Sequence, residues 1–113
     1  MAPADPLRAD LLPGTLDLLI LKTLSLGSLH GYGIARHIAR LSADVFRVEE
    51  GSLYPALQRL RVKGWVKAAW KASPTGRRAR YYELTAAGRR QLSTALDDFD
   101  RRLAALRRVL RPA

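Results

Sequence analysis

The stretch GSLYPALQR, residues 51–59, gathers groups that can hydrogen-bond to an anion. Ser52 and Tyr54 carry hydroxyls that can donate to phosphate oxygens, and Gly51 lets another molecule approach the backbone closely. Pro55 is tolerated in the first turn of a helix, because its missing N–H would have no helical partner there. The free N–H groups and dipole of a helix start favour negative charge. These residues predict contact with a phosphate backbone; ordinary surface packing is the alternative for Tyr54 and Pro55.

Two longer side chains in the same stretch could recognise bases. The amide of Gln58 can bond adenine at two positions, and the guanidinium fork of Arg59 can bond guanine in the same way. A solvated helix face is the alternative interpretation of both residues. Gln58 and Arg59 are therefore our first candidates for base reading.

A basic turn follows this stretch. The segment SPTGRRAR, residues 73–80, is rich in turn-forming residues and contains Arg77, Arg78 and Arg80. These arginines could reach phosphates or a minor groove, although Arg80 could instead brace a strand. The chain has a net charge of +10, and residues 65–113 hold twelve basic residues against four acidic ones. Nucleic acid is the expected partner of such a surface, with a merely solvated basic surface as the alternative.

The composition argues against several other kinds of chemistry. There is no cysteine, and two histidines, His30 and His37, are too few for a metal centre. We expect His30 to cap or pack a helix. No Ser–His–Asp signature, nucleotide-binding glycine loop or paired carboxylate set is visible, so we expect no enzyme and no cofactor. No apolar run approaches the ~20 residues of a membrane span and no signal peptide is visible, so a cytoplasmic protein without membrane contact is expected.

Hydrophobic periodicity predicts the elements that position these residues. Helical spacing predicts one helix from Pro13 to about Gly27, a second over residues 30–42, and a third that starts near Gly51 and stops at Gly64. On the third helix an apolar stripe lies opposite the polar face. Its residues are Leu53, Leu57 and Leu60. Two strands, joined by the basic turn, are predicted to form an antiparallel hairpin.

A final helix is predicted from about Ala86 to Leu110. Its apolar residues are spaced four, three, four, three and four positions apart, which is typical of a coiled-coil seam. We predict that this seam pairs with a second copy of the chain; folding back on the first helix of its own chain is the alternative. The seam residues are Leu92, Leu96, Phe99, Leu103, Leu106 and Leu110.

These elements predict a mainly α fold with a small β-hairpin, namely a winged helix-turn-helix plus a C-terminal dimerisation helix. We interpret residues 1–12 as a flexible N-terminal arm, residues 13–85 as the DNA-binding domain and residues 86–113 as the dimerisation helix. In this fold the second helix of the turn motif enters the major groove of double-stranded DNA.

The motifs also resemble those of a known family. The segments PGTLDLLILKTLSLGSLHGYGIARHI, VEEGSLYPALQRLRVKGWVKAAW and RRARYYELTAAGRRQL are similar to the PadR family of bacterial transcriptional regulators, in its compact subgroup with one C-terminal dimerisation helix. The resemblance implies a homodimeric repressor of an inverted-repeat operator. It places Ser52, Tyr54 and Pro55 in the DNA-facing motif and residues 75–80 in the wing. Family members often release DNA when a small hydrophobic or aromatic effector binds near the dimer interface; no effector signature is visible in this sequence.

A protein-interaction module is the competing interpretation. In that case the basic face of the winged helix would meet an acidic partner protein, and the seam would meet a foreign helix. Binding to a specific DNA duplex distinguishes the two functions, because an interaction module has no reason to prefer one duplex over another.

Overall fold

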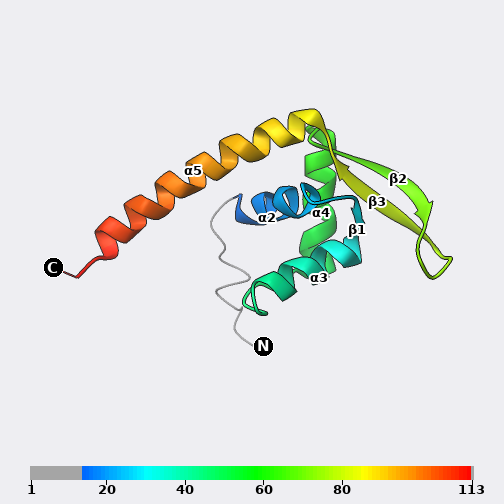
Figure 1. Ribbon diagram of the computed structural model, residues 1–113, viewed down its shortest axis with the longest axis horizontal. Coiled ribbons are helices and arrows are strands. Elements are labelled where there is room, and N and C mark those ends of the chain that lie inside the picture. The colour runs from blue at the N-terminus through cyan, green and yellow to red at the C-terminus, as the bar shows by residue number, and fades with distance from the viewer. Residues whose placement is uncertain (1–13, 113) are drawn as a thin grey trace.

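Four helices and three strands follow one another in the computed structural model, which describes residues 14–112. The arm predicted over residues 1–12 lies outside the described residues. The elements are α2 (Thr15–Leu24), β1 (Leu29–His30), α3 (Gly31–Leu41), α4 (Glu50–Val62), β2 (Val66–Ala72), β3 (Arg78–Leu84) and α5 (Ala86–Leu110). Figure 1 shows the shorter helices beside the sheet, with the β2–β3 hairpin and the free end of α5 extending to opposite sides.

The predicted hairpin is present as β2 and β3, and a third short strand joins it. The strand order is β1-β3-β2, and both pairs are antiparallel. Strand β1 pairs Leu29 with Tyr82 and His30 with Tyr81. The sequence did not predict β1, because two residues are too short to show a period of two. The hairpin turn is closed by the Ser73 N–H, which donates to the Arg77 carbonyl at 2.7 Å.

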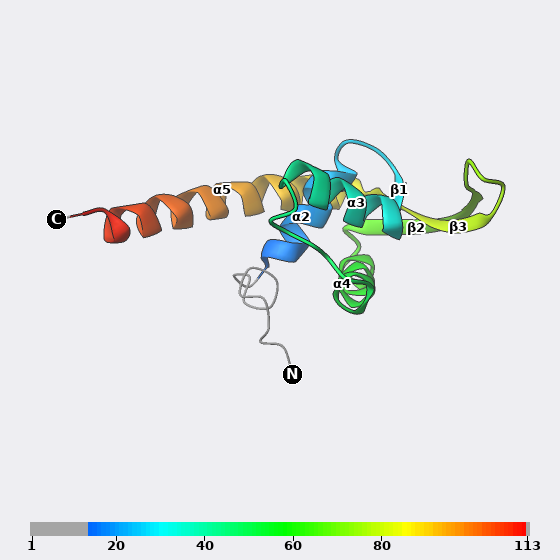
Figure 2. The same ribbon diagram turned by 90° about the horizontal axis from the view of Figure 1, so that it is seen from below.

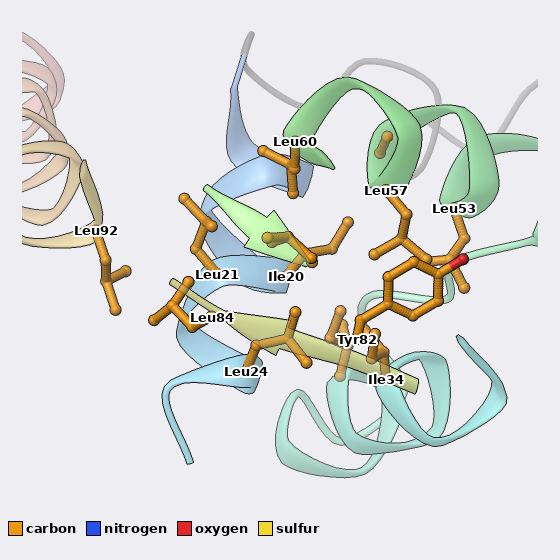
Figure 3. Close-up of a cluster of buried hydrophobic side chains, with 13 residues drawn as sticks. Ile20, Leu21, Leu24, Ile34, Leu53, Leu57, Leu60, Tyr82, Leu84 and Leu92 are labelled. Carbon is orange, nitrogen blue, oxygen red and sulfur yellow. The ribbon is translucent and has the colours of Figure 1, made fainter. Parts of the chain in front are cut away.

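One apolar core lies where the helices meet the sheet (Figure 3). The predicted stripe of α4 is confirmed, because Leu53, Leu57 and Leu60 are each at most 1% exposed. Burial of each such side chain contributes roughly 1.5–3 kcal/mol to stability. These leucines therefore hold one side of α4 in the core. The core residues are Ile20, Leu21, Leu24, Ile34, Ile38, Leu53, Ala56, Leu57, Leu60, Val66, Tyr82, Leu84 and Leu92.

Most of the helix boundaries differ from the predicted ones by one to three residues, those of α2 and α4 among them. Helix α2 ends at Leu24, before the predicted stop at Gly27. The N–H groups of residues 25–27 bond to carbonyls three positions earlier, which tightens the chain beyond the helix. The Ser25 hydroxyl also donates to the Lys22 carbonyl. Helix α4 begins at Glu50, one residue before the predicted start, so the prediction that Pro55 sits in the first turn is wrong and Pro55 lies inside the helix. Neither difference moves the apolar faces, because the helical phase is set by the buried residues.

Helix α5 starts in the core and then leaves it. The Thr85 hydroxyl accepts from the Gly88 N–H at 3.0 Å and donates to the Gly64 carbonyl at 2.7 Å, which ties the helix start to the end of α4. A Cβ on Gly88 would lie 2.0 Å from the Trp65 carbonyl oxygen, so this approach requires glycine. Figure 2 shows the rest of α5 running away from the other elements.

Candidate nucleic-acid interface

The outward face of α4 carries the side chains that the sequence singled out. All are exposed, whereas the opposite face of the same helix is in the core. An ideal Cβ on Gly51 would meet nothing within 4 Å, so the start of this helix is open to close approach. The exposed residues are Gly51, Ser52, Tyr54, Pro55, Gln58 and Arg59.

Tyr54 links α4 to the start of α3. A Cβ added to Gly31 would lie 2.7 Å from the Tyr54 hydroxyl oxygen, so the ring rests against a position that has no side chain. Burial, followed by the charges of Glu50 and Tyr82, raises the pKa of Tyr54 above its ordinary value. The phenol therefore stays protonated at neutral pH, and its hydroxyl is available as a donor.

The wing arginines lie on or beside the sheet face that continues the core outward. Trp70 pairs with Arg80 in the ladder, and this face also carries the buried Tyr82. The Arg78 guanidinium lies 5.7 Å from the centre of the Trp70 ring, and the Arg80 guanidinium lies 6.0 Å from that of Tyr82. Arg80 is half-buried, as expected of a residue that braces its strand, whereas Arg77 and Arg78 are exposed.

A hollow of about 680 Å³ separates the wing from the starts of α3 and α4. It brings Tyr54 of α4 together with Arg77, Arg78 and Arg80 of the wing, which are far apart in the sequence. Three guanidinium groups and a phenol donor around one open hollow suit a chain of phosphates better than a neutral ligand. The lining residues are His30, Gly31, Tyr32, Tyr54, Trp70, Ser73, Thr75, Arg77, Arg78, Ala79, Arg80 and Tyr82.

The two candidate base readers lie outside this hollow, and both make contacts within the chain. Gln58 Oε1 accepts from the Nε and Nη2 of Arg61, at 3.3 and 3.1 Å. Arg59 Nη2 donates to Asp17 Oδ1 of α2 at 3.0 Å. The amide oxygen of Gln58 and one nitrogen of the Arg59 guanidinium are thus already engaged within the chain.

Sequence reasoning missed two side chains of the hollow. Trp70 is 59% exposed, because β2 extends beyond the helices that cover its beginning. Tyr32 is exposed at the start of α3, with the Arg36 guanidinium 5.8 Å from its ring centre. The sequence signal for this open position was the pair of glycines on either side of Tyr32.

The predicted capping role of His30 is confirmed, because its Nδ1 accepts from the Gly33 N–H at 2.9 Å.

The α5 seam divides into two parts. Leu92 is 7% exposed and Leu96 packs against the core, so this part does fold back on its own chain. Phe99 lines a hollow of about 130 Å³ between α5 and the first turn of α2, while Leu103 is half-buried. Leu106 and Leu110 are 43% and 77% exposed. The distal part of the seam therefore leaves apolar surface uncovered by the chain that the structure describes.

Two further findings concern residues 14–112 alone. No group of three or more metal-ligating side chains comes together in this part of the chain. Over the same residues, none of the helices has the length and apolar character that crossing a bilayer requires.

Comparison with known proteins identifies the family. The model of the transcriptional regulator PadR-like family matches residues 20–94. A PadR-like transcriptional regulator from Bacillus cereus has a similar structure, with a TM-score of 0.79 and 26% identity over 93% of this chain and 100% of that one. A PadR family transcription regulator from Clostridium difficile gives a TM-score of 0.74 and 28% identity, covering 86% and 99%.

A transcriptional regulator from Clostridium thermocellum, with a TM-score of 0.83 and 24% identity over 91% and 100% of the two chains, shares the fold. The winged-helix fold, the family resemblance and the assignment as a regulator that is not an enzyme are all confirmed by these matches. DNA binding is implied by the same membership. The chain belongs to the PadR-like family of transcriptional regulators.

Proposed function

We propose that the protein is a homodimeric, sequence-specific repressor that binds an inverted-repeat operator in double-stranded DNA. The observation that carries this proposal is the hollow that joins Tyr54 to the three wing arginines. It supports a DNA backbone held between the wing and the recognition helix α4. The cytoplasm, where such DNA is found, is the corresponding location.

Contacts to phosphate supply most of the proposed affinity. The backbone at Gly51, the Ser52 hydroxyl and the Tyr54 hydroxyl donate at the start of α4, where the helix dipole also favours an anion. Pro55 lies on the outward face inside α4, where it leaves one helical backbone bond unmade. Arg77, Arg78 and Arg80 contact the adjoining backbone or minor groove from the wing.

Sequence preference is proposed to come from the middle of α4. Gln58 and Arg59 are exposed there and have the right groups for adenine and guanine. Their present contacts to Arg61 and Asp17 are exposed and exchangeable. A bidentate contact by either residue would contribute about 1–3 kcal/mol of discrimination at one base pair.

A second copy is proposed to cover the distal part of the α5 seam. Phe99, Leu103, Leu106 and Leu110 would pair across a two-fold axis, continuing from the core contacts of Leu92 and Leu96. The axis would hold two recognition helices about one DNA turn apart, ~34 Å. An inverted repeat is the operator symmetry that matches such a dimer.

Release by a small hydrophobic or aromatic effector is also part of the proposal. The hollow beside Phe99 measures about 130 Å³ within one chain, below the ~300 Å³ at which ligand pockets usually begin. An effector at this place would therefore need walls supplied by the second copy.

A salt titration tests the proposed function. Fluorescence anisotropy would compare a labelled duplex from the protein's own upstream region with a random duplex of equal length. We expect the upstream duplex to bind at least about 10³-fold more tightly at physiological salt, and both affinities to fall steeply as salt rises. Equal affinities at moderate salt would contradict the repressor and favour a module for an acidic partner protein.

A further inference from the structure

Arg59, the proposed guanine reader of α4, is held by another helix of its own chain. Its Nη2 lies 3.0 Å from Asp17 Oδ1, across 42 positions of sequence. Asp17 belongs to the first turn of α2, whose C-terminal half packs in the core beneath α4. The carboxylate is therefore fixed on one flank of the recognition helix, and it draws the guanidinium to that flank.

The ion pair has the properties of a contact that exchanges. It consists of one bond from one guanidinium nitrogen to one carboxylate oxygen, so most of the five Arg59 donors lie outside it. The side chains of Arg59 and Asp17 are 54% and 22% exposed. Because Arg59 is more than half exposed, water screens the pair, which contributes little to stability, and a base edge or phosphate can displace the carboxylate.

We propose that Asp17 restrains DNA binding by competing with DNA for Arg59, an inference that rests on the proposed function. In the free protein the guanidinium donates to Asp17, and in the complex it donates to DNA instead. The binding free energy is then smaller by the free energy of the ion pair. Asp17 touches no base itself; it is a positioning residue that acts through Arg59.

A double-mutant cycle tests this competition. Anisotropy titrations would compare wild type, Asp17→Asn, Arg59→Ala and the double variant on a duplex enriched from random DNA by the wild-type protein. With Arg59 present, we expect Asp17→Asn to tighten binding about two- to fivefold per half-site, the range of an exposed ion pair. In the Arg59→Ala background, the same substitution should change affinity much less.

Two control variants separate position from charge. Asp17→Glu keeps a carboxylate beside Arg59 and should bind like wild type. Asp44→Asn removes the same charge from the connection between α3 and α4, at a φ of 65° that asparagine also adopts. Its effect should be equal with and without Arg59. The Tm measured by thermal unfolding should change little in all variants. A structural role for Asp17 would instead lower Tm and weaken DNA binding together.

Several outcomes overturn the inference. An equal gain from Asp17→Asn in both backgrounds would mean that Asp17 acts only through bulk charge. Weaker binding by Asp17→Asn would mean that Asp17 presents Arg59 to DNA instead of withholding it. Unchanged binding by Arg59→Ala would remove Arg59 from the interface. Failure of the proposed function is distinct, because wild type itself would then not distinguish enriched from random duplex.

Discussion

Helices α4 and α5 carry similar leucine stripes that the fold buries to different extents. On α4, Leu57 is 1% exposed, and its neighbours on the stripe are buried equally well. On α5, exposure rises along the stripe, from 7% at Leu92 to 43% at Leu106 and 77% at Leu110. The same pattern of sequence thus serves a complete intramolecular interface in one helix and an incomplete one in the other.

The difference determines what each helix has available for other molecules. Because the apolar side of α4 is fully covered by its own chain, its polar face can bind a ligand without weakening the core. The apolar side of α5 is covered only near its start. Its distal turns extend from the domain (Figure 2), and Leu106 and Leu110 on them are exposed. Exposed apolar surface of this kind is where a partner gains the most from association.

The largest expected difference between the two helices follows from truncating one leucine on each stripe. Leu57→Ala should lower the free energy of unfolding by about 2–5 kcal/mol, because it leaves a cavity in the core. Leu110→Ala should lower it much less, because within its own chain the side chain meets solvent and only contacts with the proposed second copy are lost. Urea denaturation of both variants measures the contrast. Equal losses would show that the distal part of α5 is as well packed as α4.

A charge in the seam tests the proposed second copy. Leu103→Asp should weaken the dimer by about a hundredfold, or ~2.7 kcal/mol, because two carboxylates would face each other across the axis. Sedimentation velocity measures the change, and Ala104→Asp, next along the helix and exposed, is the matched control. The seam would be refuted by a Leu103→Asp protein that sediments as the wild-type dimer does.

Periodicity predicted the helices because burial in the core repeats with the helical turn. It correctly placed the stripe of α4 in the core. It could not predict β1, whose two residues are recognised only by pairing with β3. It also could not predict that Trp70 would be exposed, because that depends on how far β2 extends past the helices.

For the candidate site, the sequence predicted which residues of α4 and the turn would be exposed but not their neighbours. The contact of Tyr54 with Gly31 and the ion pair of Arg59 with Asp17 each join separate helices. Such contacts follow from the packing of one helix on another, which leaves no local pattern in the chain. Whether these residues contact DNA remains a prediction.

A smaller change isolates the polar face of α4. Tyr54→Phe keeps the ring against Gly31 and removes the hydroxyl alone, so the fold should be unaffected. We expect all duplexes to bind more weakly by about 1.5 kcal/mol per contact, the usual value of a hydrogen bond to a charged group. Because the pKa of Tyr54 is raised, this loss should be constant through neutral and mildly alkaline pH. A selection from random DNA should return the wild-type base preference; an altered preference would contradict a phosphate role.

The smallest change moves the Tyr54 hydroxyl without removing it. Gly31→Ala would place a methyl group 2.7 Å from that oxygen. The half-exposed Tyr54 ring can move aside more easily than the backbone can. A displaced side chain costs about 0.5–1.5 kcal/mol, and alanine returns up to ~1 kcal/mol of helix propensity, so Tm should barely change. Anisotropy should nevertheless show a few-fold loss of DNA affinity. In a Tyr54→Ala background the loss should disappear; if it persists, the start of α3 meets DNA through its own backbone instead of through Tyr54.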